Sequence, residues 1–173
     1  LAAGALFACA HVAHAQQVQI PTLQVCNISK ASGKALVRIE SRSDIAHSGS
    51  FEIGLEVGCD PRNPGYPTGS IGIANISMTD STIQGNIVAT SIEQLTSTGK
   101  HSPTLYVNGR CKADGDAAIG CRFWLMIANN SPGPDKGTPD VVSFLVMNGL
   151  GKRIAYGTGP VEKGDIVVQP TGN

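Results

Sequence analysis

The sequence predicts a single all-β domain, an antiparallel β-sandwich of about nine to ten short strands in an immunoglobulin-like or jelly-roll-like order. Apolar and polar residues alternate in short runs, turn residues separate these runs, and no stretch has a convincing helical period. The chain holds 21 glycines and 10 prolines with 15% charged residues, a balance that favours tight turns over disorder. A chain of 173 residues suits one domain, which can bury roughly two thirds of its unfolded surface.

The chain begins with a short apolar run, residues 1–15, that ends in Ala-His-Ala at Ala15. Small residues in this spacing are typical of signal peptidase sites, so we expect a signal peptide cleaved after Ala15 and one domain over residues 16–173. A buried N-terminal helix and lipoprotein processing at Cys9 are the alternative interpretations. No later run of about 20 apolar residues exists, so we expect no transmembrane segment. The protein is therefore expected to be exported, to the periplasm or the extracellular space.

The strands differ in how clearly the sequence marks them. Residues 51–57 alternate without a break, which is the best strand pattern in the N-terminal half. Residues 121–128 are continuously apolar after Arg122, which predicts a central strand buried on both faces. Residues 87–95 fit neither period well and could form a strand or a short helix. Residues 59–69 hold three prolines and two glycines, so we expect no regular structure there. The other expected strands are 18–26, 36–39, 71–78, 104–107, 141–147, 153–157 and 165–168, with a polar turn at 27–33.

Four cysteines follow the expected signal peptide: Cys26, Cys59, Cys111 and Cys121. An even number in an exported chain predicts disulfides, with three possible connectivities. Cys111 and Cys121 flank a turn-rich segment of nine residues, which favours pairing them and leaves Cys26 with Cys59. Zinc ligation is the alternative, but no C-x-x-C spacing occurs and two histidines, His47 and His101, follow the signal peptide.

The C-terminal part of the chain carries a further pattern of aromatic, turn and alternating apolar residues. It consists of Phe123 to Ile127, Asn129-Asn130, Pro139-Asp140, Phe144, Val146, Gly159-Pro160-Val161, Gly164, Ile166 and Val168. This pattern resembles the small secreted β-sandwich modules called post-COAP-1 domains, found at the ends of bacterial exported proteins, and covers most of residues 50–168. The chain departs from the family at Asn130, where Asp-Asn-Gly is usual, and in its two expected disulfides. The resemblance implies a sandwich in an exported setting and transfers no catalytic residue.

Acidic and amide residues gather in two expected loops. Calcium takes about six to eight oxygen ligands and often collects them from loops at one end of a sandwich, so these residues are candidates for calcium or another ligand. The alternative interpretation is that they close hairpins and cap turns. No other cofactor is expected. The candidates are Asp114, Asp116, Asn129, Asn130, Asp135 and Asp140.

Aromatic and basic residues supply the remaining candidates. Tyr66, Tyr106, Trp124 and Tyr156 would suit sugar stacking, but Trp124 lies in the most apolar run and is expected in the core. Tyr66, in the proline-rich segment, is the expected exposed aromatic. Five basic residues flank the cysteine hairpin and a later turn, and would bind a phosphate or sulfated glycan if they converge, or else form a solvated strand face. They are Arg110, Lys112, Arg122, Lys152 and Arg153.

Charge and motifs narrow the function. With 13 basic and 13 acidic residues and no basic stripe, the chain does not look like a nucleic-acid binder. No G-x-S-x-G elbow and no other catalytic arrangement is evident. We therefore expect a non-enzymatic exported module with an accessory, adhesive or structural role and an unknown protein or glycan partner. The alternatives are a pilus-like subunit that assembles by strand exchange, and an exported hydrolase using His47 or His101.

Overall fold

The computed structural model describes residues 26–40, 48–78, 85–99, 103–114, 120–130 and 137–170. Their regular structure is entirely β. The eight strands are β1 (Ile28–Ile39), β2 (Gly49–Asp60), β3 (Asn63–Asn75), β4 (Asn86–Thr98), β5 (Thr104–Ala113), β6 (Cys121–Ala128), β7 (Val141–Asn148) and β8 (Arg153–Pro170). Within these ranges no helix is long and apolar enough to cross a membrane. The expected signal peptide, Cys9, His47 and His101 lie outside the described residues.

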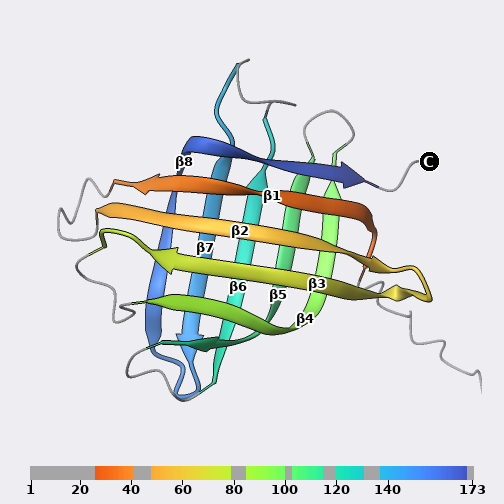
Figure 1. Cartoon of the computed structure of the whole chain (residues 1–173), viewed down its shortest axis with the longest axis horizontal. Coiled ribbons are helices and arrows are strands. Elements are labelled where there is room, and N and C mark those ends of the chain that lie inside the picture. Colours follow the sequence, from red (N-terminus) through yellow and green to blue (C-terminus); the bar gives the residue numbers. More distant parts are fainter. Residues whose placement is uncertain are drawn as a thin grey trace, which may run out of the picture.

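The eight strands form a closed antiparallel barrel in which each strand pairs with its neighbours in sequence (Figure 1). β8 returns to pair with β1, from Ile28 opposite Pro170 to Val37 opposite Val161. The predicted sandwich of nine to ten strands is therefore wrong. One face of a strand is apolar in a sandwich and in a barrel alike, so alternation along the sequence does not distinguish them. The difference lies in the pairing of the first strand with the last.

The expected and observed strands differ in their bounds and number, and the expected strand 18–26 lies outside the described residues except for Cys26. The polar segment 27–33 lies mostly in β1, residues 87–95 lie in β4, and the last two expected strands form the single strand β8. The proline-rich segment 59–69 is mostly strand, with a turn at Pro61 and Arg62. Its two other prolines fit in β3 because β3 meets β4 only at Gly72–Ala74 in the described pairing, and an unpaired edge needs no amide donor.

The barrel is flattened into two layers whose strands cross (Figure 1). β1, β2, β3 and the end of β8 form one layer, and β5, β6, β7 and the start of β8 form the other. β4 and β8 bend from one layer into the other. Two β-bulges help β4 to turn, and in β8 the backbone of Gly159 lies so close to β1 that a Cβ would be 1.7 Å from the Arg38 carbonyl oxygen.

Apolar side chains fill the barrel, as expected for a barrel of eight strands. Phe51 of β2 and Phe144 of β7 meet edge to face with their ring centroids 4.8 Å apart, so they join the two layers at the centre. Each such buried side chain contributes about 1.5–3 kcal/mol through removal from water. The largest fully buried side chains are Phe51, Phe123, Ile28, Ile39, Ile53, Ile73, Ile87, Leu95, Leu105, Ile127 and Ile166.

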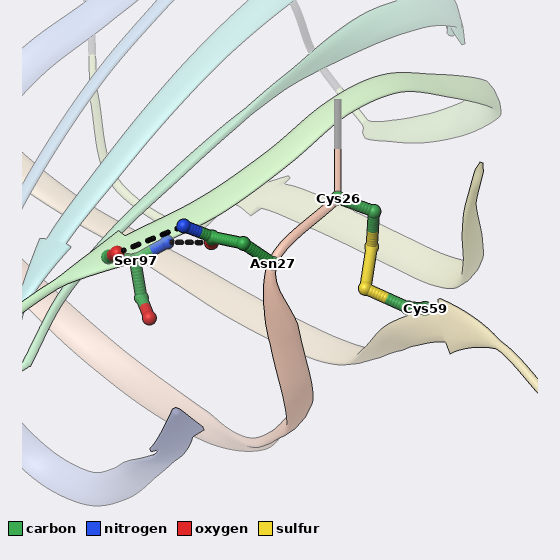
Figure 2. Close-up of a disulfide and its surroundings, with 4 residues drawn as sticks. All are labelled: Cys26, Asn27, Cys59 and Ser97. Atoms are coloured by element: carbon green, nitrogen blue, oxygen red, sulfur yellow. Dashed lines mark hydrogen bonds between the residues drawn. A yellow bond between two sulfur atoms is a disulfide. The ribbon is translucent and has the colours of Figure 1, made fainter. Parts of the chain in front are cut away.

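The structure joins Cys26 to Cys59 and Cys111 to Cys121, the pairing that the sequence favours. Cys111 and Cys121 are direct cross-strand partners in the β5–β6 ladder. Cys26 forms an isolated parallel bridge with Leu95 of β4. The side-chain amide of the next residue, Asn27, pairs with the backbone of β4 (Figure 2). The amide of Ser97 donates to Asn27 Oδ1 over 2.7 Å, and Asn27 Nδ2 donates to the Ser97 carbonyl over 3.3 Å. The start of β1 is thus fixed to β4 and β2.

Candidate binding face on the outer wall

Of the candidate calcium-binding loop residues that the structure describes, Asp114 lies apart from Asn129, Asn130 and Asp140. Asp114 follows the end of β5, whereas Asn129 and Asn130 follow the end of β6. Because these two strands are antiparallel partners, with Cys111 opposite Cys121 at one end of the ladder, Asp114 and the asparagines lie at opposite ends of the barrel. Among the described residues no group of three or more His, Cys, Asp or Glu could hold a metal ion.

The described loop candidates instead make contacts that fix strand ends. The carboxylate of Asp114 accepts a hydrogen bond from the Asn86 amide over 2.9 Å at the start of β4. Asp140, which is buried, accepts one from the Asn130 amide over 2.8 Å, and Asn129 Nδ2 donates to the Ile166 carbonyl over 3.2 Å. These hydrogen bonds join strand ends and loops that are 10 to 37 residues apart in sequence. The remaining two candidates, Asp116 and Asp135, lie outside the described residues.

β6 is not buried on both faces as predicted, and its outward side chains begin the candidate site. Burial alternates along the strand, with Phe123 and Leu125 inside the barrel and Arg122, Trp124 and Met126 outside. The expectation that Trp124 packs in the core is wrong, since its side chain is 39% exposed. The outward residues are themselves apolar or aromatic after Arg122, so the sequence looks continuously apolar although the strand has two different faces.

Pairing between strands extends these outward residues into three rows across β5 to β8. Trp124 stands between Asn108 and Leu145, and Leu145 pairs with Tyr156. The parallel rows are Tyr106, Met126, Ser143 and Thr158 on one side, and Arg110, Arg122, Met147 and Arg153 on the other. We call this surface the aromatic face. It consists of Tyr106, Asn108, Arg110, Arg122, Trp124, Met126, Leu145, Met147, Arg153 and Tyr156.

The aromatic face is hollowed into adjoining grooves. One groove of about 690 Å³ lies at the cysteine end and is lined by Arg110, Lys112, Arg122, Trp124 and Met147 among others. A second of about 390 Å³ runs between Tyr106, Trp124 and Leu145, and a third of about 420 Å³ lies over Leu145 and Tyr156. Trp124 borders the first and second grooves and Leu145 borders the second and third, so the three grooves adjoin one another along the aromatic face.

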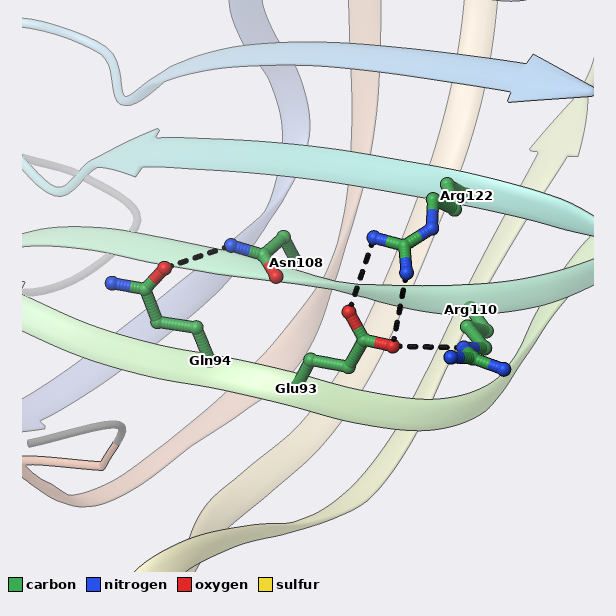
Figure 3. A network of polar contacts seen from close by, with 5 residues as sticks. All are labelled: Glu93, Gln94, Asn108, Arg110 and Arg122. Atoms are coloured by element: carbon green, nitrogen blue, oxygen red, sulfur yellow. Dashed lines mark hydrogen bonds and ion pairs between the residues drawn. The ribbon is translucent and has the colours of Figure 1, made fainter. Parts of the chain in front are cut away.

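A bulge in β4 supplies the carboxylate of this face. Glu93 is the extra residue between two registered pairs, Ile92 with Gly109 and Gln94 with Asn108, and a bulge of this kind redirects a side chain. Glu93 bridges Arg110 and Arg122 (Figure 3). Its Oε1 accepts from Arg110 Nε over 2.8 Å, and its Oε2 lies 3.3 Å from Arg122 Nη1. Since the two arginines are direct cross-strand partners with like charge, Glu93 offsets their repulsion.

Two further contacts order the polar groups of the face. Asn108 Nδ2 donates to Gln94 Oε1 over 2.9 Å, which fixes a pair of amide groups beside Trp124. The guanidinium of Arg153 lies 4.6 Å from the ring centroid of Tyr156, a cation–π contact that covers one side of this ring. The rings of Trp124 and Tyr106 are the more exposed aromatic groups of the face.

The sequence anticipated parts of this site. Of the five basic residues that were candidates for a converging patch, Arg110, Lys112 and Arg122 line one groove, Arg153 lines another, and Lys152 lines none of the three. Tyr66 is 60% exposed but lies on β3, in the other layer, apart from the remaining aromatic residues. Strict alternation applied to residues 121–128 would have placed Arg122 and Trp124 on one face.

Comparisons of the chain with protein-family models, with curated proteins and with solved structures find no match. The sandwich implied by the resemblance to post-COAP-1 modules is not the fold observed.

Proposed function

We propose that the protein is an exported binding module that acts by holding a protein partner on the aromatic face, in an accessory, adhesive or structural role. The observation that carries the proposal is the exposure of Trp124 and Tyr106 in registered rows beside Met126 and Leu145. A contiguous apolar patch with a polar border is characteristic of an interaction surface. Tyr, Trp, Met and Arg are also the residues in which protein–protein interfaces are enriched.

The composition of the face favours a protein over a glycan. Leu145 lies between Trp124 and Tyr156, Met126 pairs with Tyr106, and Met147 lies between Arg122 and Arg153. The thioethers adapt well to the irregular side chains of a protein surface. The leucine offers no hydrogen bond to the hydroxyls of a sugar, and the thioether sulfurs are only weak acceptors. The two disulfides support export, because such bonds persist in oxidising compartments, and we therefore place the protein in the periplasm or outside the cell.

Assembly by strand exchange needs a free strand edge. β1 and β8, the first and last strands, pair along most of their length. In the described part of the barrel β3 before Gly72 and β4 after Val88 do not pair with each other. Pro64 and Pro67 of this β3 edge lack amide donors, and Cys26 and Asn27 cover the β4 edge at Leu95 and Ser97. A partner strand would pair poorly with these edges, which favours the aromatic face as the binding surface.

Site-specific photo-crosslinking tests the proposal with a matched pair of tyrosines. Tyr106 on the aromatic face and Tyr66 on the opposite layer are both exposed, so the additional benzoyl group of benzoylphenylalanine can extend into solvent at either position in the full chain. Irradiation of the cells that make the protein should give a protease-sensitive adduct from position 106 and none from position 66. An adduct from position 66 alone, or from neither position, contradicts the proposal. An adduct that glycosidases remove and proteases do not would replace the protein partner with a glycan.

A further inference from the structure

We infer that the partner is an acidic protein segment whose carboxylates bind Arg110 and Arg122 at the cysteine end of the aromatic face, in the position that Glu93 now occupies. The inference rests on the proposed function, since it assumes that a protein covers this face. It adds the chemistry of the partner and the position of its charges relative to its apolar contact.

Basic residues are concentrated at this end of the face. Arg110, Lys112 and Arg122 line the groove of about 690 Å³, and Arg153 continues their row on β8. The whole chain carries equal numbers of basic and acidic residues, so the concentration is a local excess of positive charge. Glu93 is the carboxylate bound between the arginines. A groove with this charge raises the local concentration of an acidic partner and speeds its association.

Glu93 shows where a partner carboxylate would bind. It contacts Arg110 through Nε, and the two terminal nitrogens of Arg122 lie 3.3 and 3.5 Å from its two carboxylate oxygens (Figure 3). The side chains of Arg110 and Arg122 are 65% and 52% exposed, which leaves N–H groups open to an acceptor from outside. A carboxylate that takes two parallel N–H groups of a guanidinium binds more strongly than one that takes a single group.

The geometry also places the partner's apolar contact. Arg122 and Trp124 are two residues apart on the same side of β6, which separates them by about 7 Å along the strand. In an extended chain, alternate residues are also separated by about 7 Å. A partner segment that places an apolar or aromatic side chain on Trp124 would therefore place an acidic residue, two positions along, beside the arginines. Acidic and apolar residues in alternation are thus the expected sequence of the partner.

A second copy of the chain does not fit this description. Stacking the same face of two copies would bring the rows of arginines near one another, with Glu93 as the acidic group that each copy offers there. Two protomers related by a twofold axis present the same patch to each other, so the excess of positive charge would be doubled and not neutralised.

Intrinsic fluorescence tests the inference, because Trp124 is the only tryptophan of the chain and borders the groove. Poly-L-glutamate added to the full chain should change the emission of Trp124 with saturation, and the affinity should fall as salt rises from about 0.02 to about 0.2 M. Arg122→Gln should weaken binding about tenfold. Lys34→Gln, which removes an exposed charge from β1 in the other layer, is the matched control and should leave binding unchanged.

The variant Glu93→Gln distinguishes a binding site from a merely structural ion pair. If Glu93 occupies the place of a partner carboxylate, its removal should tighten poly-L-glutamate binding several-fold. If the two arginines need Glu93 to hold their geometry, binding should weaken, and this result would overturn the inference. Thermal melting of each variant shows that the barrel remains folded, as expected for exposed side chains.

Two further outcomes overturn the inference. One is a lack of any saturable change in Trp124 emission with poly-L-glutamate at low salt. The other is tight binding of dextran sulfate under conditions where poly-L-glutamate does not bind, which would indicate a sulfated glycan. If either result is found while position 106 still crosslinks to a protein, the proposed function stands and the acidic partner is rejected. If poly-L-glutamate does not bind and position 106 gives no crosslink, both the acidic partner and the proposed function are rejected.

Discussion

Replacing Cys26 and Cys59 together with alanine is expected to destabilise the barrel more than replacing Cys111 and Cys121 together. A disulfide limits the unfolded chain, and the effect grows with the loop it closes. The first pair is separated by 33 residues and the second by 10. In the chain-entropy model these loops correspond to about 4 and about 3 kcal/mol at 25 °C.

The structure makes the two replacements comparable. Three of the four cysteines are almost fully buried and Cys59 packs against the same core, so the loss of packing is similar in the two double variants. The difference of about 1 kcal/mol in the free energy of unfolding between the two double variants therefore measures the difference in loop-closure entropy. Cys111 and Cys121 also keep their ladder neighbours when the bond is absent. Cys26 keeps a bridge to Leu95 and the adjacent hydrogen bonds of Asn27.

Urea unfolding followed by circular dichroism measures the difference. At a slope of about 1–3 kcal/mol per M, the variant without Cys26 and Cys59 should unfold about 0.3–1 M before the variant without Cys111 and Cys121. Equal urea midpoints, or the reverse order, with unchanged slopes would show that loop length does not determine how much each disulfide stabilises the barrel. A changed slope would indicate a change in the compactness of the unfolded chain or a loss of two-state unfolding, and the extrapolated free energies of unfolding would then be compared in place of the midpoints.

Two smaller predictions follow from local geometry. Gly159→Ala should lower the free energy of unfolding by about 1–3 kcal/mol, because its Cβ would meet the carbonyl oxygen of Arg38. Gly65→Ala, with nothing within 4 Å of its Cβ, is the control and should be neutral in the same urea unfolding experiment. The hydrogen bond and charge of Lys30 hold the pKa of the Glu56 carboxyl below its ordinary value, so an NMR titration should show this pKa rise in Lys30→Gln. The pKa of Glu56 is lower in the folded protein than in the unfolded chain. The stabilisation that the Lys30–Glu56 pair gives to the folded state is therefore complete above the ordinary carboxyl pKa and is lost as pH falls through the lowered pKa.

The sequence predicted local properties well where a short stretch determines them. Residues 51–57 alternate with period two, and β2 buries Phe51, Ile53, Leu55 and Val57 as this pattern requires. The economical pairing of Cys111 with Cys121 follows from the short segment between them, and they lie opposite each other in one hairpin. Tyr66 is exposed as its neighbouring prolines and glycines indicate.

The sequence failed where a residue's role depends on its partners across the sheet. Trp124 was expected in the core because its neighbours are apolar, but the strand directs alternate residues to opposite faces. Glu93 had no distinguishing local pattern, since its position between two arginines depends on an irregularity in the pairing of β4 with β5. Bulges depend on the register of two strands, and one strand's sequence does not contain that register.

By itself, then, the sequence determined an all-β chain with two pairs of cysteines and a neutral, weakly charged composition, because these properties depend on residue types and short-range periodicity. The tertiary structure alone decided that β1 closes on β8 and that Tyr106, Trp124, Leu145 and Tyr156 form one face. Both results require strands distant in sequence to adopt one register. That register is set by how all the inward side chains pack together in the barrel, and not by any single strand.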